Sequence, residues 1–392
     1  MIKQLTTTNP FKLLLITTSL VFILVACGGS NPAPESQSNN GTQPPVEFDY
    51  QELIDGAISE AVPGIVLLVE NPERSFLGSA GLANVEEQTP METYHVMPNG
   101  SAGKKLTALL TVMLDEEGLL SLDDTIDNWL SEAILSQVEN SENITLRQLL
   151  NHTSGIRNYL DGDISDKFFQ ALLADPESIK TDSYALDFGL NLPAYFFPGE
   201  GYKYSNTGYL LVGLILDEVL GEHHSLAMRN RILIPFGMNS SFYNGVEKSL
   251  GEIISGYVVD DEYGEFDSKP YYENIGVADA PLSANVEDLA LLLRMIVGPD
   301  DDVSPYVKDQ LFGESYLVKI DESTHYGLGL FIETVNNKVV YHHNGLEPGY
   351  STTNIYIPDS QTSITIFFNC GLSDQCENET DSLSRTVLFN EL

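Results

Sequence analysis

Ser101-Ala-Gly-Lys104 opens a long amphipathic stretch, residues 104–117, whose apolar spacing is helical and which Gly118 stops. Residues three apart on a helix share one face, so we expect the Ser101 hydroxyl and the Lys104 amine to meet. A serine hydroxyl becomes a strong nucleophile only when a neighbouring base takes its proton, and a helix N-terminus favours both an oxyanion and a neutral lysine. The spacing predicts a covalent hydrolase, although chance alone could supply it in a chain so rich in serine.

Short β-rich runs lie on both sides of a mostly helical middle. We expect a helix over 50–61 and strands over 64–70 and 75–82, then helices over 104–117, 146–150, 207–220 and 286–296, then strands over 327–335, 338–343, 352–357 and 362–369. Because an isolated hairpin is barely stable, the terminal strands should join in one antiparallel sheet. The sequence therefore predicts an α+β fold with helices flanking the sheet and a helical insertion over roughly residues 106–280, and Ser101 at the first crossing, where clefts form readily.

A second candidate segment runs from Pro198-Gly-Glu-Gly-Tyr-Lys to Tyr204-Ser-Asn206 and then into an apolar helical stretch. An ammonium nearby would lower the pKa of the Tyr204 phenol and let it relay a proton. The Asn206 amide could donate to and accept from a substrate amide. Tyr272-Glu-Asn274 has the same spacing but lacks the flanking turn and helix, so we interpret it as a surface loop.

A third candidate is His343-Asn-Gly345 at the end of a predicted strand. Gly345 would let a substrate backbone approach the strand, and a cationic His343 could hold a substrate carboxylate. The alternative is that His342 and His343 are ordinary strand residues on opposite faces of the sheet. A further segment, His152-Thr-Ser-Gly155, is typical of a turn after a short helix.

Taken together, these segments resemble the serine β-lactamase and D-alanyl-D-alanine peptidase superfamily, which carries Ser-x-x-Lys, Tyr-x-Asn and Lys- or His-x-Gly boxes in this order. The resemblance covers the chain from about Phe48 to its C-terminus. It extends to the flanking segments Leu106-Thr-Ala-Leu-Leu110, Glu116-Glu-Gly-Leu-Leu-Ser-Leu-Asp-Asp124, Leu149-Leu-Asn-His-Thr-Ser-Gly155, Pro281-Leu-Ser-Ala-Asn-Val-Glu-Asp288, Tyr326-Gly-Leu-Gly329 and Gly345-Leu-Glu-Pro-Gly-Tyr350.

The sequence departs from the family pattern in two places. Met97-Pro-Asn-Gly100 precedes the nucleophile where the family usually has an aromatic, a basic and an apolar residue, and His343-Asn344 replaces lysine and a small hydroxyl residue. These changes put the β-lactamase carboxylate contact in doubt and favour peptidase or esterase relatives. Lys105 is also within reach of Ser101, but the family register selects Lys104, and we expect Lys105 to be solvated.

The resemblance implies an acyl-enzyme mechanism on a peptide amide or ester, most simply that of a D-Ala-D-Ala-type carboxypeptidase or an esterase. Ser101 would attack, Lys104 and Tyr204 would share the base role, and the N–H groups of Ser101 and Leu346 would hold the oxyanion. Asn206 would orient the substrate amide, and His343 with Gly345 its carboxylate side. The alternatives are a β-lactamase, or a cell-envelope lipoprotein of this fold that binds without turnover.

The N-terminal residues predict export and a lipid anchor. Residues 1–26 contain two lysines before an apolar run that is too short for a lasting membrane span, which indicates a signal peptide. Leu24-Val-Ala-Cys27 resembles the lipobox of bacterial lipoproteins, so we expect Cys27 to be acylated; the alternative is ordinary cleavage nearby. Residues 27–47 are a polar tether before the hydrolase domain at 48–392. Gly28 and Gly29 favour an outer-membrane anchor facing the periplasm.

Charge and composition narrow the partners. With 57 acidic and 19 basic residues the net charge is −38, which opposes binding to nucleic acid. The sequence has no His-Glu-x-x-His zinc motif and no phosphate-binding loop, so we expect no metal and no cofactor. In an oxidising envelope Cys370 and Cys376 are candidate disulfide partners, and two free thiols are the alternative.

Overall fold

The computed structural model describes residues 48–260, 264–300 and 302–392. The predicted signal peptide, the lipidated Cys27 and the tether lie outside these residues. The helices are α1 (Tyr50–Asp55), α2 (Lys104–Glu116), α3 (Glu132–Leu135), α4 (Leu146–Leu150), α5 (Gly162–Ala174), α6 (Asp182–Leu186), α7 (Asn206–Leu220), α8 (His224–Met228), α9 (Lys269–Tyr272), α10 (Val286–Val297), α11 (Pro305–Phe312) and α12 (Asp374–Glu391).

The strands form one large antiparallel sheet and two small ones. They are β1 (Gly64–Glu70), β2 (Ser75–Asn84), β3 (Thr89–Pro90), β4 (Met97–Pro98), β5 (Phe242–Tyr243), β6 (Tyr257–Asp260), β7 (Gly264–Asp267), β8 (Leu282–Ala284), β9 (Val318–Lys319), β10 (Thr324–Tyr326), β11 (Phe331–Val335), β12 (Lys338–His342), β13 (Gly345–Glu347), β14 (Tyr350–Ile357) and β15 (Thr362–Phe368).

The large sheet joins the two ends of the described chain. Its strand order is β3-β2-β1-β15-β14-β12-β11-β10-β9. β13 pairs with the N-terminal end of β14, before the residues of β14 that pair with β12. β1 runs antiparallel to β15, with Val66 opposite Phe367. The prediction that N-terminal and C-terminal strands share one sheet, in an α+β fold, is confirmed.

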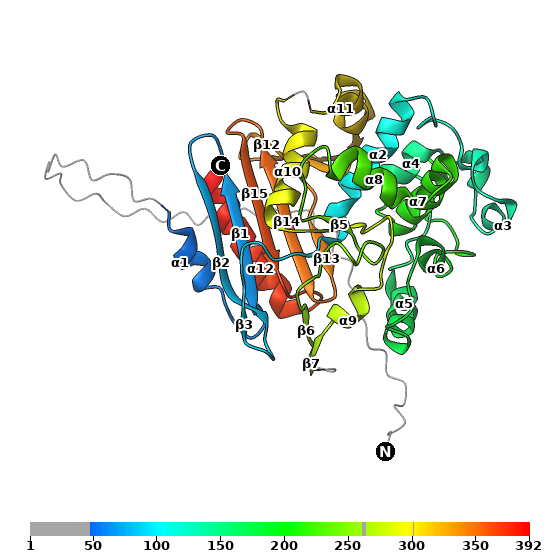
Figure 1. Cartoon of the computed structure of the whole chain (residues 1–392). Coiled ribbons are helices and arrows are strands. Elements are labelled where there is room, and N and C mark those ends of the chain that lie inside the picture. The colour runs from blue at the N-terminus through cyan, green and yellow to red at the C-terminus, as the bar shows by residue number, and fades with distance from the viewer. Residues whose placement is uncertain (1–47, 261–263, 301) are drawn as a thin grey trace, which may run out of the picture.

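Both faces of this sheet are covered, because its central strands bury side chains in both directions. Ile65 and Leu67 of β1 pack with the α1 and α12 side, while Val66 and Leu68 between them pack into the larger core that includes α2, α7 and α10. Figure 1 shows α1 and α12 against the sheet and the green and cyan helices gathered to one side of it. The alternation fixes the strand register, since a slip by one residue would exchange the two faces.

The chain leaves and re-enters the sheet region at two short strands that pair with each other. β4 lies just before Ser101, β8 comes just after Asp279, and Met97 pairs with Ala284. β5 pairs with the other side of β8. The ends of the helical insertion are therefore held side by side, and the segment that starts α2 lies at this junction.

Two predicted elements differ from the structure, and a long helix lies where none was predicted. The first helix ends at Asp55 and not at residue 61, because Gly56 caps it and the chain turns toward β1. Of the strand expected over 327–335 only residues 331–335 are extended, as β11. Residues 327–330 form the turn that joins β11 to β10, since Gly327 N–H donates to the Leu330 carbonyl (2.9 Å) and Gly329 has a φ of +76°. No helix was expected after residue 369, yet α12 covers the sheet there.

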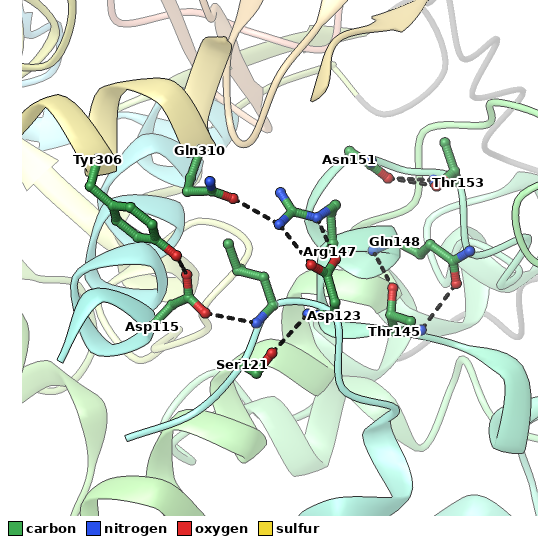
Figure 2. Close-up of polar contacts among 11 residues, drawn as sticks. Asp115, Ser121, Asp123, Thr145, Arg147, Gln148, Asn151, Thr153, Tyr306 and Gln310 are labelled. Atoms are coloured by element: carbon green, nitrogen blue, oxygen red, sulfur yellow. Dashed lines mark hydrogen bonds and ion pairs between the residues drawn. The ribbon is translucent and has the colours of Figure 1, made fainter. Parts of the chain in front are cut away.

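A polar network outside the core fixes the start of the segment that carries His152. Arg147 of α4 donates to Asp123 (2.7 Å) and to Gln310 of α11 (2.8 Å), and Thr145 and Gln148 form a capping box at the helix N-terminus. Figure 2 shows these residues linking α4, the loop before it and α11. α4 is thereby anchored on two sides just before the chain turns inward.

Within the described ranges, none of the helices combines the length and the apolar character that a membrane crossing requires.

Candidate active site

Ser101 and Lys104 meet where a short 3-10 turn becomes α2. The turn covers Gly100–Gly103 and follows β4 directly, so the paired strands β4 and β8 set its position. Lys104 Nζ lies 3.1 Å from Ser101 Oγ, and it also donates to Asn206 Oδ1 (2.7 Å) and to the Asp279 carbonyl (2.6 Å). The serine hydroxyl and the lysine amine expected on one face are therefore in contact.

Burial makes Lys104 a usable base. Its side chain is fully enclosed, and loss of solvation lowers its pKa from 10.5 to about 8, while the charges of Asp279 and Glu347 act in the opposite direction. An amine with this pKa is partly neutral near neutral pH and can accept the hydroxyl proton of Ser101.

The prediction that Lys105 is solvated is wrong. Its side chain is as buried as that of Lys104, and Nζ lies 3.5 Å from the His343 carbonyl oxygen. Burial lowers its pKa to about 7. Successive residues on a helix point about 100° apart, and because α2 is enclosed on all sides, both lysines are buried but face different elements.

Tyr204 lies at the site, but its pKa moves opposite to the prediction. Burial raises the pKa of the phenol well above 10, and the interaction with Ser101 lowers it only in part. Lys104 Nζ sits over the ring, 5.3 Å from the centroid. The cation therefore meets the ring face, and Tyr204 is a neutral phenol that can donate a proton but is not ionised in advance.

Asn206 begins α7 and uses its side-chain oxygen on Lys104. A lysine ammonium only donates, so the amide oxygen must face Nζ and the NH₂ group is left for a substrate. The Asn206 backbone N–H donates to Asn158 Oδ1 (3.1 Å), which fixes the residue. The prediction that this amide serves both as donor and acceptor to substrate is therefore reduced to donation.

His343 is a buried neutral residue, contrary to the predicted cation. Burial and the two nearby lysines lower its pKa well below 6.5. Its Nδ1 faces the Asn344 carbonyl (2.9 Å), so Nδ1 carries the proton and Nε2 accepts from the Tyr326 hydroxyl (3.2 Å). A substrate carboxylate would therefore meet no positive charge on this imidazole.

A hydrogen-bonded chain continues from His343 to His152. His152 Nδ1 accepts from the Ser205 N–H (3.2 Å), so its Nε2 carries the proton and donates to Tyr326 Oη (3.2 Å). His152 has a φ of +62°, which is rare for a residue with a side chain. Its ring packs against that of Tyr204, with centroids 4.1 Å apart. The segment expected to be a simple turn thus supports the site.

Position 345 must be a glycine because the neighbouring chain leaves no room for a side chain. A Cβ at this position would lie 2.0 Å from the Asn99 carbonyl oxygen, so β13 packs directly on the residues before Ser101. The prediction assigned this space to a substrate backbone, whereas Asn99 occupies it. A Cβ added to Gly100 would lie 3.2 Å from the Leu346 nitrogen, so the Leu346 N–H is close to the nucleophile.

Two acidic residues that the sequence analysis did not select lie in a pocket at the site. Tyr159 donates to Asp279 Oδ2 (3.1 Å) and Tyr272 to Glu347 Oε2 (2.6 Å). Burial raises the pKa of Asp279, and raises that of Glu347 to about 7. Two sequence features could have pointed to them. Asp279 is an acid within the apolar run at 275–284, and Glu347 is an acid two residues after Gly345 on a strand.

The segment Tyr272-Glu-Asn274 is not the surface loop expected. The Tyr272 and Asn274 side chains are buried, and the Tyr272 hydroxyl contributes to the pocket described above. The loop is folded inward because Asn244 donates to the carbonyl groups of Tyr272 (2.9 Å) and Ile275 (2.7 Å).

One group of side chains has metal-ligand character, away from Ser101. The ligand atoms of Asp217, His223 and His224 lie within 4.8 Å of one another. His224 already uses Nδ1 on Asp217 (2.8 Å) and Nε2 on the Tyr243 hydroxyl (2.7 Å). These internal hydrogen bonds explain why the three side chains lie together at the start of α8.

Cys370 and Cys376 are joined by a disulfide, with Cα atoms 6.2 Å apart. The bond links the end of β15 to the first turn of α12. It lies in the core on the α12 side of the sheet.

Comparison with known proteins extends these observations. Residues 50–386 match the Beta-lactamase family model. The chain is 28% identical to penicillin-binding protein 4* of Bacillus subtilis over 84% of the chain and 72% of that protein. It is also similar to the octameric penicillin-binding protein homologue of Pyrococcus abyssi, at 28% identity over 82% of this chain and 74% of that one, with a TM-score of 0.70.

A third similarity is to the D-stereospecific amidohydrolase of a Streptomyces species. The two chains share 24% identity over 82% of this chain and 93% of that one, and the TM-score is 0.69. At this level of identity the likeness concerns the fold.

Proposed function

The chain belongs to the Beta-lactamase family and is a serine hydrolase of that family, and from this we propose that it cleaves a peptide amide or an ester through an acyl-enzyme on Ser101. The observation that carries the proposal is the contact of Lys104 Nζ with Ser101 Oγ at 3.1 Å, with the lysine pKa lowered to about 8.

In the proposed reaction Ser101 Oγ attacks the substrate carbonyl carbon and its proton passes to neutral Lys104. The N–H groups of Ser101 and Leu346 stabilise the oxyanion. The proton then moves to the leaving amine or alkoxide as the C–N or C–O bond breaks, with Tyr204 as a neutral relay. Water attacks the acyl-Ser101 ester, releases the acid and restores the free serine.

The electrostatics of the site favour some substrates over others. A carboxypeptidase or β-lactamase substrate presents a carboxylate, and His343 is neutral where that charge would be bound. Asp279 and Glu347 lie nearby, and in its ionised form either group would repel a substrate carboxylate. We therefore rank esters and amides without a terminal carboxylate above D-Ala-D-Ala peptides, and these above β-lactams.

The proposal is tested by turnover and burst kinetics on a p-nitrophenyl ester, an amino-acid p-nitroanilide, a D-Ala-D-Ala peptide and nitrocefin. We expect hydrolysis of the ester or anilide, an initial burst of about one equivalent of chromophore wherever deacylation is the slow step, and no activity in Ser101→Ala. Ser121→Ala, in a loop outside the site, is the matched control and should behave as wild type. A protein that turns over none of these substrates would support the alternative of a binding protein of this fold.

We also propose that the protein is anchored to a bacterial membrane through acylated Cys27, which the Leu24-Val-Ala-Cys27 sequence supports. Incorporation of labelled palmitate that is lost in Cys27→Ser would bear this out. Release of an unlipidated wild-type protein into the soluble fraction would contradict it.

A further inference from the structure

We infer that the acidic pocket of Asp279 and Glu347, close to Lys104 and Ser101, binds a substrate ammonium group, so that the preferred substrates are amides or esters whose acyl part carries a free amine. This inference rests on the proposed hydrolase function. It goes further, because it names the group that the pocket recognises and the two carboxylates that recognise it.

The pocket presents two carboxyl groups, each held by one tyrosine and each with a second oxygen to spare. Asp279 Oδ2 accepts from Tyr159, and Oδ1 is buried without a hydrogen-bond partner among the described residues. Asp279 is 3% exposed and lines the pocket. A buried carboxylate oxygen without a donor is costly, so a donor supplied by a ligand would be favourable.

Glu347 completes the arrangement from the opposite element. Its Oε2 accepts from Tyr272 (2.6 Å), while Oε1 lies toward Gly100, where an added Cβ would be 3.3 Å from it. Gly100 directly precedes the nucleophile, so this oxygen is on the substrate side of Ser101. Asp279 and Glu347 therefore line one pocket, and each is next to the catalytic segment: Asp279 through its carbonyl contact with Lys104 and Glu347 through its approach to Gly100.

The charge balance of the pocket leaves room for one cation. Lys104 is the cation that acts on both carboxyl groups, and it must be neutral when it takes the Ser101 proton. At that moment any carboxylate charge on Asp279 or Glu347 would be buried without a positive partner, which is unfavourable. A substrate ammonium would supply the charge and would also donate up to three hydrogen bonds.

The rest of the lining is apolar and aromatic. Phe168 and Phe169 of α5, Leu160, Ile275 and Val277 surround the acidic pair. The cavity volume is about 20 Å³, which holds one small group such as an ammonium but no side chain. An α-amino acid residue with a free amine carries such a group on the carbon next to its carbonyl.

The competing explanation is that the two carboxyl groups only support Lys104. In that case their removal would slow every substrate to the same extent. If they bind an ammonium group, removal would affect substrates with a free amine and spare those without one.

The experiment compares phenylalanine p-nitroanilide with its N-acetyl form, each as D and L enantiomers, at pH 7. We expect the wild-type protein to prefer the free amine by about tenfold or more in kcat/KM. Glu347→Gln and Asp279→Asn should each reduce this preference about tenfold, because kcat/KM falls further for the free amine than for the N-acetyl form. Glu273→Gln, a neighbouring carboxylate that is not in the pocket, should leave the preference unchanged.

Equal or better cleavage of the N-acetyl form by wild type, or an equal loss on both forms in the variants, would overturn the inference. If neither anilide is cleaved, protection of Ser101 from a fluorophosphonate by phenylalaninamide is compared with protection by N-acetylphenylalaninamide. Equal protection overturns the inference while labelling of Ser101 upholds the hydrolase. If Ser101 is not labelled at all, the proposed function fails and the inference with it. Unfolding curves of both variants show whether they are folded.

Discussion

The ammonium group of Lys104 donates a hydrogen bond to the main-chain carbonyl of Asp279 at 2.6 Å, across a sequence separation of 175 residues. The contact is possible because β4 and β8 pair where the helical insertion begins and ends. It joins the nucleophile segment to the acidic pocket. One lysine therefore contacts the nucleophile, Asn206 and the return strand, and its position depends on all three.

The two adjacent lysines should respond differently to replacement. Lys104→Met removes the proposed base and should lower acylation by roughly 10²–10⁴-fold. Lys105→Met removes a buried amine with one long contact, so activity should stay within a few-fold and the melting temperature should hold or rise. Acylation rates and thermal unfolding of both variants check this. A Lys105 variant as inactive as the Lys104 variant would contradict the assignment.

Activity should rise with pH as Lys104 loses its proton. The neutral form accepts the Ser101 proton, and the lysine pKa is lowered to about 8, so kcat/KM should increase from about pH 6, reach half its maximum near pH 8 and level off about one unit above. Lys105→Met should keep this midpoint, because the pKa of Lys105 is lower, at about 7. A pH profile on the N-acetyl anilide measures it. A rate that falls over this range would show that Lys104 acts in its charged form.

Gly345 should tolerate no side chain. In Gly345→Ala the new Cβ would lie 2.0 Å from the Asn99 carbonyl, so β13 or the turn before Ser101 must move, and both stability and acylation should fall. We expect a loss of about 1–3 kcal/mol in the free energy of unfolding. Gly118→Ala is the control, since it meets only backbone strain at φ +71° and no atom within 4 Å. Equal acylation by the two variants would argue against close packing of β13 on the site.

Removing the Tyr326 hydroxyl should destabilise the fold. Tyr326→Phe leaves His343 Nε2 without a donor and His152 Nε2 without an acceptor, which should cost about 1–3 kcal/mol in unfolding free energy. Tyr341→Phe, on β12 of the same sheet, is the control and should change little. Chemical denaturation gives both values. A Tyr326→Phe variant with the same unfolding free energy as wild type would mean that this chain of hydrogen bonds does not stabilise the fold.

The fold was predictable where one signal dominated. The β-rich apolar run of β1 and the helical apolar repeat of α2 predicted elements that match the structure to within a residue. The hairpin of β10 and β11 could not be predicted in this way. Its turn depends on the left-handed conformation of Gly329, which lies within a run of residues that favour a strand. α12 has weak apolar periodicity and depends on its contacts with the sheet.

The residues of the site could be predicted from the sequence, but their protonation states could not. Ser101, Lys104, Tyr204, Asn206 and His343 come together, as the order of the boxes indicates. Their protonation differs, because burial raises the pKa of Tyr204 and lowers that of His343, and burial is a property of the folded chain. Lys105 was misjudged for the same reason.

The account is tested most directly by intact-protein mass spectrometry after treatment with an activated fluorophosphonate, followed by peptide mapping. It predicts one adduct per chain, on Ser101, formed by the wild type and by Ser121→Ala but not by Ser101→Ala, and formed far more slowly by Lys104→Met. An adduct on another serine, or an unmodified Ser101 in the folded wild-type protein, would contradict it.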